Sequence, residues 1–299
     1  MKLAERTIQF ADTLTVLTDG YIRAGRVLQQ EGSHVEAGKH FATANQGQPG
    51  NVLAAIGLAQ TQLKNSESIN LFEASLLILF LDEPFAAIHT LDNLLQPPNT
   101  GRSAEAAAML ASLRAYPRPG VSSSDQAKEK VKARELYDRV CKMLSLPEQA
   151  HQPLNGQTAT LTRSHRRVAE DVELHAEIAK LFYQEDLGRV ERAYQEAVRL
   201  CEAAGRTDPR LINNLSALRH LTGHLDEARS MYERALTDAS GQGTRESDSM
   251  ATSILYNLAR VYEDQGEDTM AKDAYEKLLS RHPEYVDGVL RTLAFLSGY

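Results

Sequence analysis

The sequence contains no tryptophan, and only two of its 299 residues are cysteines, Cys141 and Cys201. These two cysteines lie far apart in segments of helical pattern, so we expect neither a disulfide framework nor a metal site, and a reduced intracellular compartment. Aromatic residues make up only 6% of the chain. This composition favours many small cores over one large hydrophobic centre.

The sequence also lacks a long apolar run. The most apolar stretch, Ala74 to Leu81, is far shorter than the roughly 20 residues that a membrane-spanning helix needs. The first residues, MKLAERTIQFADTL, carry charges and no continuous apolar core, which is unlike a secretory signal. We therefore expect a soluble protein.

Neither charge sign dominates strongly. The chain has 33 basic and 40 acidic residues, for a formal net charge of -7. Proteins that bind nucleic acid along most of their surface need a strong basic excess. This balance therefore argues against nucleic-acid binding as the general function.

Known catalytic and cofactor motifs are missing as well. The sequence has no GxGxxG, P-loop, GxSxG, HExxH or CxxC pattern. His220 and His224 are four residues apart and could bind a metal from one helical face, but Gly223 places His224 in a turn, so we interpret both as surface residues. His175 occupies a position that a large packing residue usually fills. We expect no catalytic residue, no cofactor and no metal.

One stretch, Ser253 to Pro283, carries a strong repeat pattern. Its residue types fit two helices that pack around a tight turn at Gly266, with a proline at the end. They match the tetratricopeptide signature of a large residue, a Leu-small pair, a tyrosine, a later A-x3-aromatic and a closing proline. The matching residues are Leu255, Leu258, Ala259, Tyr262, Ala271, Tyr275 and Pro283.

The same spacing recurs along the chain. A second clear copy lies near the N-terminus, where Leu28, Gly32, Ala37 and Phe41 occupy equivalent positions. Further units begin near Val52, Val172 and Leu211. After Pro283 another first helix begins, and the chain stops at Tyr299 before a partner helix, so we expect a fragment of a longer protein.

These repeats predict an all-α fold, a tetratricopeptide-repeat right-handed superhelix of the α-solenoid type. Residues 1–144 and 168–299 are predicted to form repeats, the last one incomplete, with 145–167 as an irregular linker. An insert at about 64–84 is either an extra helix packed on the array or a segment peculiar to this protein. The cluster RSHRR at 163–167 is interpreted as a solvated surface patch or a helix lead-in instead of a phosphate site, because the surrounding sequence is not basic.

A binding surface follows from the repeat pattern. First helices of such arrays line the inner groove, which can hold an extended or helical segment of another protein. In the clear units, the residues next to the packing positions should face this groove. They are Ile22, Arg26, Gln29, Lys180, Tyr183, Asn213, Ala217, His220, Tyr256, Arg260 and Glu263.

Parts of the sequence resemble one family in more detail. The relevant residues are Ile212-Asn213-Asn214, Tyr256-Asn257-Leu258-Ala259-Arg260, and His282-Pro283 with Tyr285-Val286-Asp287. Asn213, Asn214, Asn257 and Arg260 are not needed for repeat packing. Together these residues resemble the tetratricopeptide scaffold subunit of the RNA polymerase II-associated PAF elongation complex, a similarity that spans most of the chain except 64–84 and the stretched third unit.

The resemblance implies a non-catalytic nuclear scaffold. Such a subunit binds the other PAF subunits and so helps couple elongating RNA polymerase II to chromatin-modifying factors, with no membrane and no sequence-specific nucleic acid as a direct partner. Two alternatives stay open. One is a general tetratricopeptide co-chaperone or adaptor that binds a peptide segment, for which Asn257 and Arg260 offer part of a carboxylate clamp. The other is a repeat domain of a larger enzyme.

Overall fold

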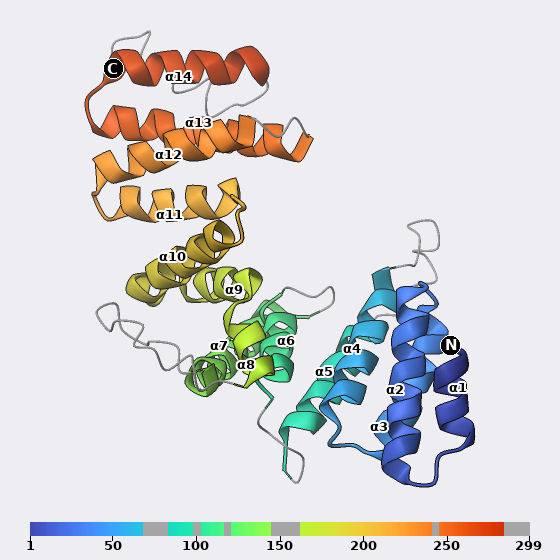
Figure 1. Cartoon of the computed structure of the whole chain (residues 1–299). Coiled ribbons are helices and arrows are strands. Elements are labelled where there is room, and N and C mark those ends of the chain that lie inside the picture. Colours follow the sequence, from blue (N-terminus) through green and yellow to red (C-terminus); the bar gives the residue numbers. More distant parts are fainter. Residues whose placement is uncertain (68–82, 98–102, 117–120, 145–161, 241–244, 284–299) are drawn as a thin grey trace. The chain divides into compact units, whose positions relative to one another are not determined.

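The computed structural model describes residues 1–67, 83–97, 103–116, 121–144, 162–240 and 245–283, which form α-helices joined by short turns (Figure 1). The first seven helices are α1 Lys2–Gln9, α2 Leu14–Gln30, α3 His34–Gly47, α4 Val52–Glu67, α5 Glu83–Leu95, α6 Ala104–Ala115 and α7 Ser123–Leu144. The others are α8 Arg163–Ala169, α9 Val172–Phe182, α10 Leu187–Ala203, α11 Pro209–Leu221, α12 Leu225–Ser240, α13 Arg245–Asp264 and α14 Asp268–Arg281.

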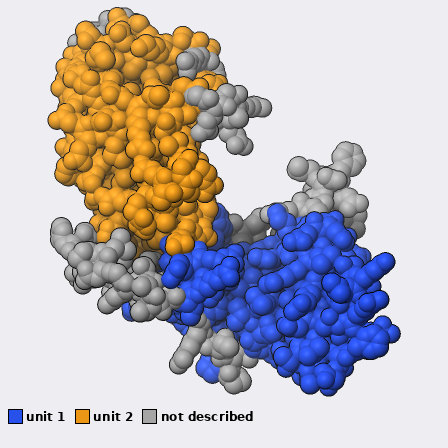
Figure 2. Space-filling view, in the orientation of Figure 1, with its two compact units in different colours: residues 1–147, 154–169 blue, residues 148–153, 170–299 orange. Residues whose placement is uncertain are grey.

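The chain divides into two compact units (Figure 2). Unit 1 comprises residues 1–147 and 154–169, and unit 2 comprises residues 148–153 and 170–299. Within unit 1 the helix pairs α2–α3, α4–α5 and α6–α7 pack in sequence, with α8 against α6 and α7; within unit 2 the pairs are α9–α10, α11–α12 and α13–α14. Each unit is therefore a stack of helix pairs, as predicted for tetratricopeptide repeats.

Sharp turns separate the two helices of a pair. Gly223 after α11 and Gly266 after α13 have φ angles of 81° and 74°, a left-handed conformation that disfavours residues with a Cβ. After α13, the Glu267 amide donates to the Tyr262 carbonyl at 2.9 Å and the Gly266 amide donates to the Glu263 carbonyl at 2.9 Å. These two bonds end the helix and confirm the turn predicted at Gly266.

Small residues allow close helix packing. In unit 2, Ala259 and Ala271 are completely buried in the cluster that also contains Tyr275. In unit 1, the Phe41 ring of α3 lies between Gly25 of α2 and Gly57 of α4, where an added Cβ would be 3.0 Å from the ring at Gly25 and would overlap it at Gly57. The small residues of the repeat pattern therefore make room for the aromatic ones.

Three of the predicted segments lie partly or wholly outside the residues that the structure describes. Helix α4 extends to Glu67 and α5 begins at Glu83, so the predicted insert at 64–84 falls mostly on residues 68–82, outside the described chain. Helix α8 begins at Arg163, inside the predicted irregular linker, whose residues 145–161 are also outside the described chain. The first helix expected after Pro283 lies at 284–299, again outside it.

Within the described ranges, no helix combines the length and the apolar character required to cross a membrane.

Candidate protein-interaction site

The residues predicted to line a groove are divided between the two units. Eight of them lie in unit 2, on or just after the first helices α9, α11 and α13. Ala217 of α11 is the smallest, and we call the surface formed by the other seven the first-helix face: Lys180, Tyr183, Asn213, His220, Tyr256, Arg260 and Glu263. Ile22, Arg26 and Gln29 lie on α2 of unit 1.

Asparagine side chains connect the helices of the first-helix face to one another and to α10. Asn257 Nδ2 of α13 donates to Asn213 Oδ1 of α11 at 3.1 Å, and Asn213 Nδ2 donates to Asn214 Oδ1 at 3.3 Å. Asn214 Nδ2 in turn donates to the Tyr194 hydroxyl of α10 at 3.3 Å. The expectation that these asparagines are not needed for packing is wrong, because their half-buried amides satisfy one another across three helices.

One hydrogen bond and one ion pair extend this connection along the first helices. His220 Nε2 of α11 lies 2.6 Å from Asp264 Oδ2 of α13, and Arg210 of α11 lies 3.4 Å from Glu173 of α9. The His220 side chain is 14% exposed, so the residue interpreted from sequence as a surface histidine bridges neighbouring repeats. Asp264 was missed because it lies 44 residues further along the chain, beyond the reach of any local pattern.

Tyrosines of the second helices reach towards the same face. The Tyr275 hydroxyl of α14 donates to Glu263 Oε2 at 2.9 Å, and its ring lies 6.0 Å from that of Tyr256 between centroids. Tyr232 of α12 is only 1% exposed, and burial raises the pKa of its hydroxyl, against the opposing charge of Arg260. Tyr232 and Tyr275 are therefore buried packing residues, and the Tyr275 hydroxyl holds the Glu263 side chain of α13.

Three side chains of the first-helix face remain open to solvent. Tyr183, which caps α9, is 50% exposed, and Lys180 is exposed although it pairs with Glu177 at 3.2 Å. Arg260 is exposed and forms no ion pair with any residue that the structure describes. An exposed aromatic ring and an unpaired guanidinium, next to side chains that hydrogen bonds hold in place, are features of a protein-binding surface.

One of the three predicted residues of unit 1, Gln29, also connects successive first helices. Gln29 Nε2 of α2 lies 3.5 Å from Gln60 Oε1 of α4, which joins two successive first helices. Arg26 is exposed. Ile22, however, is 3% exposed and packs in a cluster with Phe41, so its assignment to a groove is wrong; it lies on the face of α2 that packs against α3.

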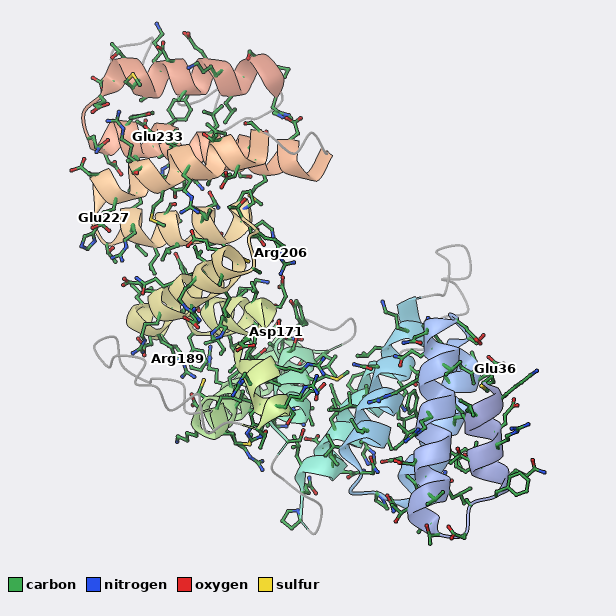
Figure 3. All side chains as sticks on the ribbon, in the orientation of Figure 1. Glu36, Asp171, Arg189, Arg206, Glu227 and Glu233 are labelled. Carbon is green, nitrogen blue, oxygen red and sulfur yellow. The ribbon has the colours of Figure 1, made fainter. Side chains whose placement is uncertain are left out.

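Helix α12 of unit 2 has further polar contacts, near Glu227 and Glu233, which are labelled in Figure 3. Arg229 pairs with Glu233 at 3.1 Å and with Glu267 at 2.9 Å, and its guanidinium lies 5.0 Å from the centre of the Tyr262 ring. Burial and the Glu233 hydrogen bond raise the pKa of Tyr262. These contacts join α12 to α13 and account for the charged residues there without a ligand.

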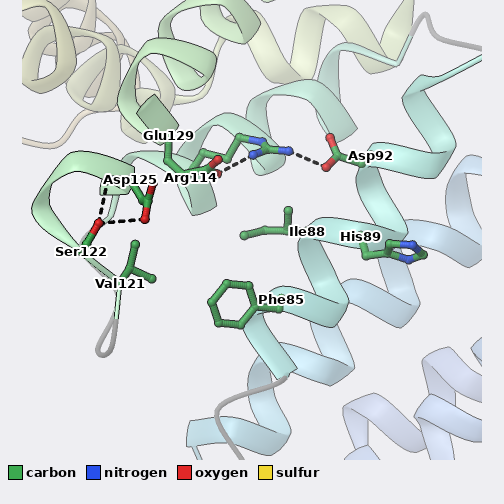
Figure 4. Close-up of a pocket in the computed structure, with 9 residues that line it drawn as sticks. All are labelled: Phe85, Ile88, His89, Asp92, Arg114, Val121, Ser122, Asp125 and Glu129. Atoms are coloured by element: carbon green, nitrogen blue, oxygen red, sulfur yellow. Dashed lines mark hydrogen bonds and ion pairs between the residues drawn. The ribbon is translucent and has the colours of Figure 1, made fainter. Parts of the chain in front are cut away.

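Unit 1 contains an open cavity of about 530 Å³ between α5 and α7 (Figure 4). At its inner end Arg114 of α6, 8% exposed, binds Asp92 of α5 and Glu129 of α7. Burial alone would raise the pKa of Glu129, but Lys132 and Arg114 lower it below the ordinary value. Arg114, Asp92 and Glu129 therefore join α5, α6 and α7 to one another.

His220 and His224, the two histidines with the spacing of metal ligands, have different partners. His220 pairs with Asp264, whereas His224 Nδ1 lies 3.0 Å from Thr222 Oγ1, so different groups hold the two rings. Among the described residues there is no group of three or more potential metal ligands. His175 is 4% exposed, in agreement with a packing position.

Comparisons with known proteins agree with this architecture. Residues 254–285 match a family model described as tetratricopeptide repeat. Tetratricopeptide repeat protein 1 of Schizosaccharomyces pombe is 25% identical over 97% of this chain. This chain spans only 24% of that protein, so the activity and partners of a whole protein of this kind are matters of proposal.

Solved structures show the same fold. One of them is the crystal structure of YrrB, a TPR protein with an unusual peptide-binding site. It superposes with a TM-score of 0.55 at 13% identity, over 84% of this chain and 96% of that one. Pseudomonas aeruginosa PilF superposes with a TM-score of 0.53 at 15% identity, over 94% and 97% of the two chains. The chain is therefore an all-α protein with the tetratricopeptide-repeat fold.

Proposed function

We propose that this chain is a scaffold without catalytic activity that binds segments of other proteins on the first-helix face of unit 2. Tetratricopeptide arrays are protein-interaction modules, and stacked pairs present continuous binding surfaces. The observation that carries the proposal is the series of contacts that joins the first helices: Arg210 with Glu173, Asn213 with Asn257, and His220 with Asp264. Tyr183 and Arg260 stay exposed on the same helices or directly after them. A pre-ordered surface loses less entropy when a partner binds.

We further propose that the partners are subunits of the PAF complex, and through them RNA polymerase II and chromatin-modifying factors in the nucleus. Support comes from the resemblance at Ile212–Asn214 and Tyr256–Arg260. The structure supplies a packing role for Asn213, Asn214 and Asn257, so among these residues Arg260 is the one that packing leaves unexplained. A general adaptor that binds a peptide segment uses the same face.

The test is affinity purification of the chain from nuclear extract, followed by mass spectrometry. The wild type is compared with a triple variant, Asn213→Ala, Tyr256→Ala and Arg260→Ala. A control triple variant, Asp273→Ala, Glu276→Ala and Lys277→Ala, changes exposed or charged positions of α14 in the same repeat. Circular dichroism establishes that both variants keep the helical content of the wild type.

We expect PAF subunits and polymerase with the wild type and the control, and their loss with the first-helix variant. Recovery of chaperones alone would support the general adaptor and contradict the PAF assignment. If both variants retain the same partners as the wild type, the first-helix face is not the binding surface, and the proposal fails.

A further inference from the structure

A second surface, separate from the first-helix face, is formed where α8 packs against α6 and α7 in unit 1. The last part of α7, residues 135–144, and α8, residues 163–169, together contain five basic and two acidic residues, in a chain with 33 basic and 40 acidic residues overall. The basic excess of these two helices is invisible in the sequence, because residues 145–162 separate them. The fold brings them together (Figure 1).

The ends of the helices that meet can be identified. Arg114, at the end of α6, binds Glu129, near the start of α7, so these two helices are antiparallel and the start of α6 lies beside the last turns of α7. Ser164 and His165 of α8 line a cavity with Ser103 and Ala104, at the start of α6. Helix α8 is therefore next to the last turns of α7, which carry Arg139 and Lys142.

We call Arg139, Lys142, Arg163, Arg166 and Arg167 the α7–α8 basic surface; all five are exposed. Lys142 and the three arginines of α8 form no ion pair within the described parts of the chain. Because α8 has seven residues and is about 10 Å long, its arginines lie close together. Glu105, one of the nearby carboxylates, lines the cavity and does not pair with them in the described structure.

We infer that the α7–α8 basic surface binds an acidic segment, rich in Asp and Glu, of a partner protein. Lys142 and the three arginines of α8, which form no ion pair in the described structure, attract carboxylates, and arginine binds them with two parallel hydrogen bonds. A nucleic acid fits less well. Helix α8 has no aromatic residue, and Tyr137 of α7 is only 1% exposed, so bases would find no ring to stack on in these two helices.

The experiment measures binding by fluorescence anisotropy with the full chain. One probe is a fluorescein-labelled peptide of alternating Asp and Glu, and the other is a labelled single-stranded DNA of equal charge. The test variant is Arg163→Gln, Arg166→Gln, Arg167→Gln, since glutamine preserves helix propensity. The control variant removes three exposed cations elsewhere in unit 1, Arg6→Gln, Arg23→Gln and Lys39→Gln. Circular dichroism is compared for all three proteins.

We expect the test variant to weaken peptide binding about tenfold and the control variant less than about twofold, with binding that declines as salt is raised from about 0.05 to 0.2 M. We also expect DNA to bind more weakly than the peptide. Unchanged peptide affinity in the test variant, or an equal loss in both variants, would overturn the proposal. Equal or tighter binding of DNA would assign the surface to nucleic acid instead. Neither result bears on the first-helix face, which uses other residues.

Discussion

Ala259 shows how strongly a single small side chain can constrain this fold. It has no exposed surface and lies in the same buried cluster as Ala271 of the partner helix. The space between α13 and α14 is filled by larger neighbours such as Tyr275, which is also completely buried. A longer side chain here has no route to solvent without separating the helices.

Replacing Ala259 by glutamate should therefore lower the free energy of unfolding by about 3 kcal/mol or more, because a carboxylate would be buried without a partner. Urea denaturation followed by circular dichroism measures the effect. The matched control is Ala217→Glu, at an exposed position of α11, where the change should be within about 0.5 kcal/mol. An unchanged midpoint for the Ala259 variant would show that the assigned packing position is wrong.

At the scale of elements, Arg114 connects three successive helices of unit 1. Its guanidinium binds Asp92 of α5 and Glu129 of α7, while its own side chain on α6 is 9% exposed. Removal of Arg114 would take an ion-pair partner from the Glu129 carboxylate, whose side chain is 16% exposed and which also pairs with Lys132. Such a site combines a stabilising contact with a marked sensitivity to the loss of one member.

Arg114→Met should lower the free energy of unfolding by about 1–3 kcal/mol, between the values typical of exposed and fully buried pairs. The effect should depend on pH. Because the folded pKa of Glu129 is below its ordinary value of 4.5, its contribution is present above that value and is lost as pH falls through the folded pKa.

The difference in unfolding free energy between wild type and Arg114→Met should thus shrink as pH is lowered from 7 towards about 3. Thermal or urea unfolding across this range measures it. Lys128→Met is the control, since Lys128 and Asp125 form an exposed pair with side chains 70% and 58% exposed, worth at most about 1 kcal/mol. A difference that stays constant with pH would contradict the role given to the Glu129 charge.

The helix pairs could be predicted from sequence, whereas the contacts between them could not. Within a pair, Leu258, Ala259 and Ala271 recur at fixed spacing because one turn, at Gly266, always joins the same two helices. The bonds of Asn213 to Asn257 and of His220 to Asp264 each span 44 residues, a separation that includes all of α12 and a large part of α13. The contact of α7 with α8 crosses residues 145–162, so sequence alone suggested that the RSHRR cluster had no basic neighbourhood.

At the scale of the whole molecule, helices contact near neighbours along the chain. The substantial contacts in the described residues join helices no more than two places apart in order, and the chain separates into two compact units. Stability in such arrays is approximately a sum of the stabilities of the pairs and of their interfaces. Damage to one pair should therefore spread only to its neighbours.

Hydrogen exchange with mass spectrometry can examine this expectation in the Ala259→Glu variant. We expect faster exchange in α11 to α14 of unit 2 and unchanged protection in α2 to α7 of unit 1, because local opening follows cooperative groups of elements. Ala217→Glu should match the wild type throughout. Equal loss of protection in both units would show that the chain unfolds as one cooperative body.

The same neighbour-to-neighbour packing determines how the protein would respond to mechanical tension. A chain pulled from its two ends would not have to lose all of its structure at once, since each helix pair can detach from the stack by itself. A pair of roughly 34 residues adds about 11 nm of extended chain when it opens. A protein built in this way can lengthen in steps under load and shorten again pair by pair, so it could keep two tethered partners connected while the distance between them changes.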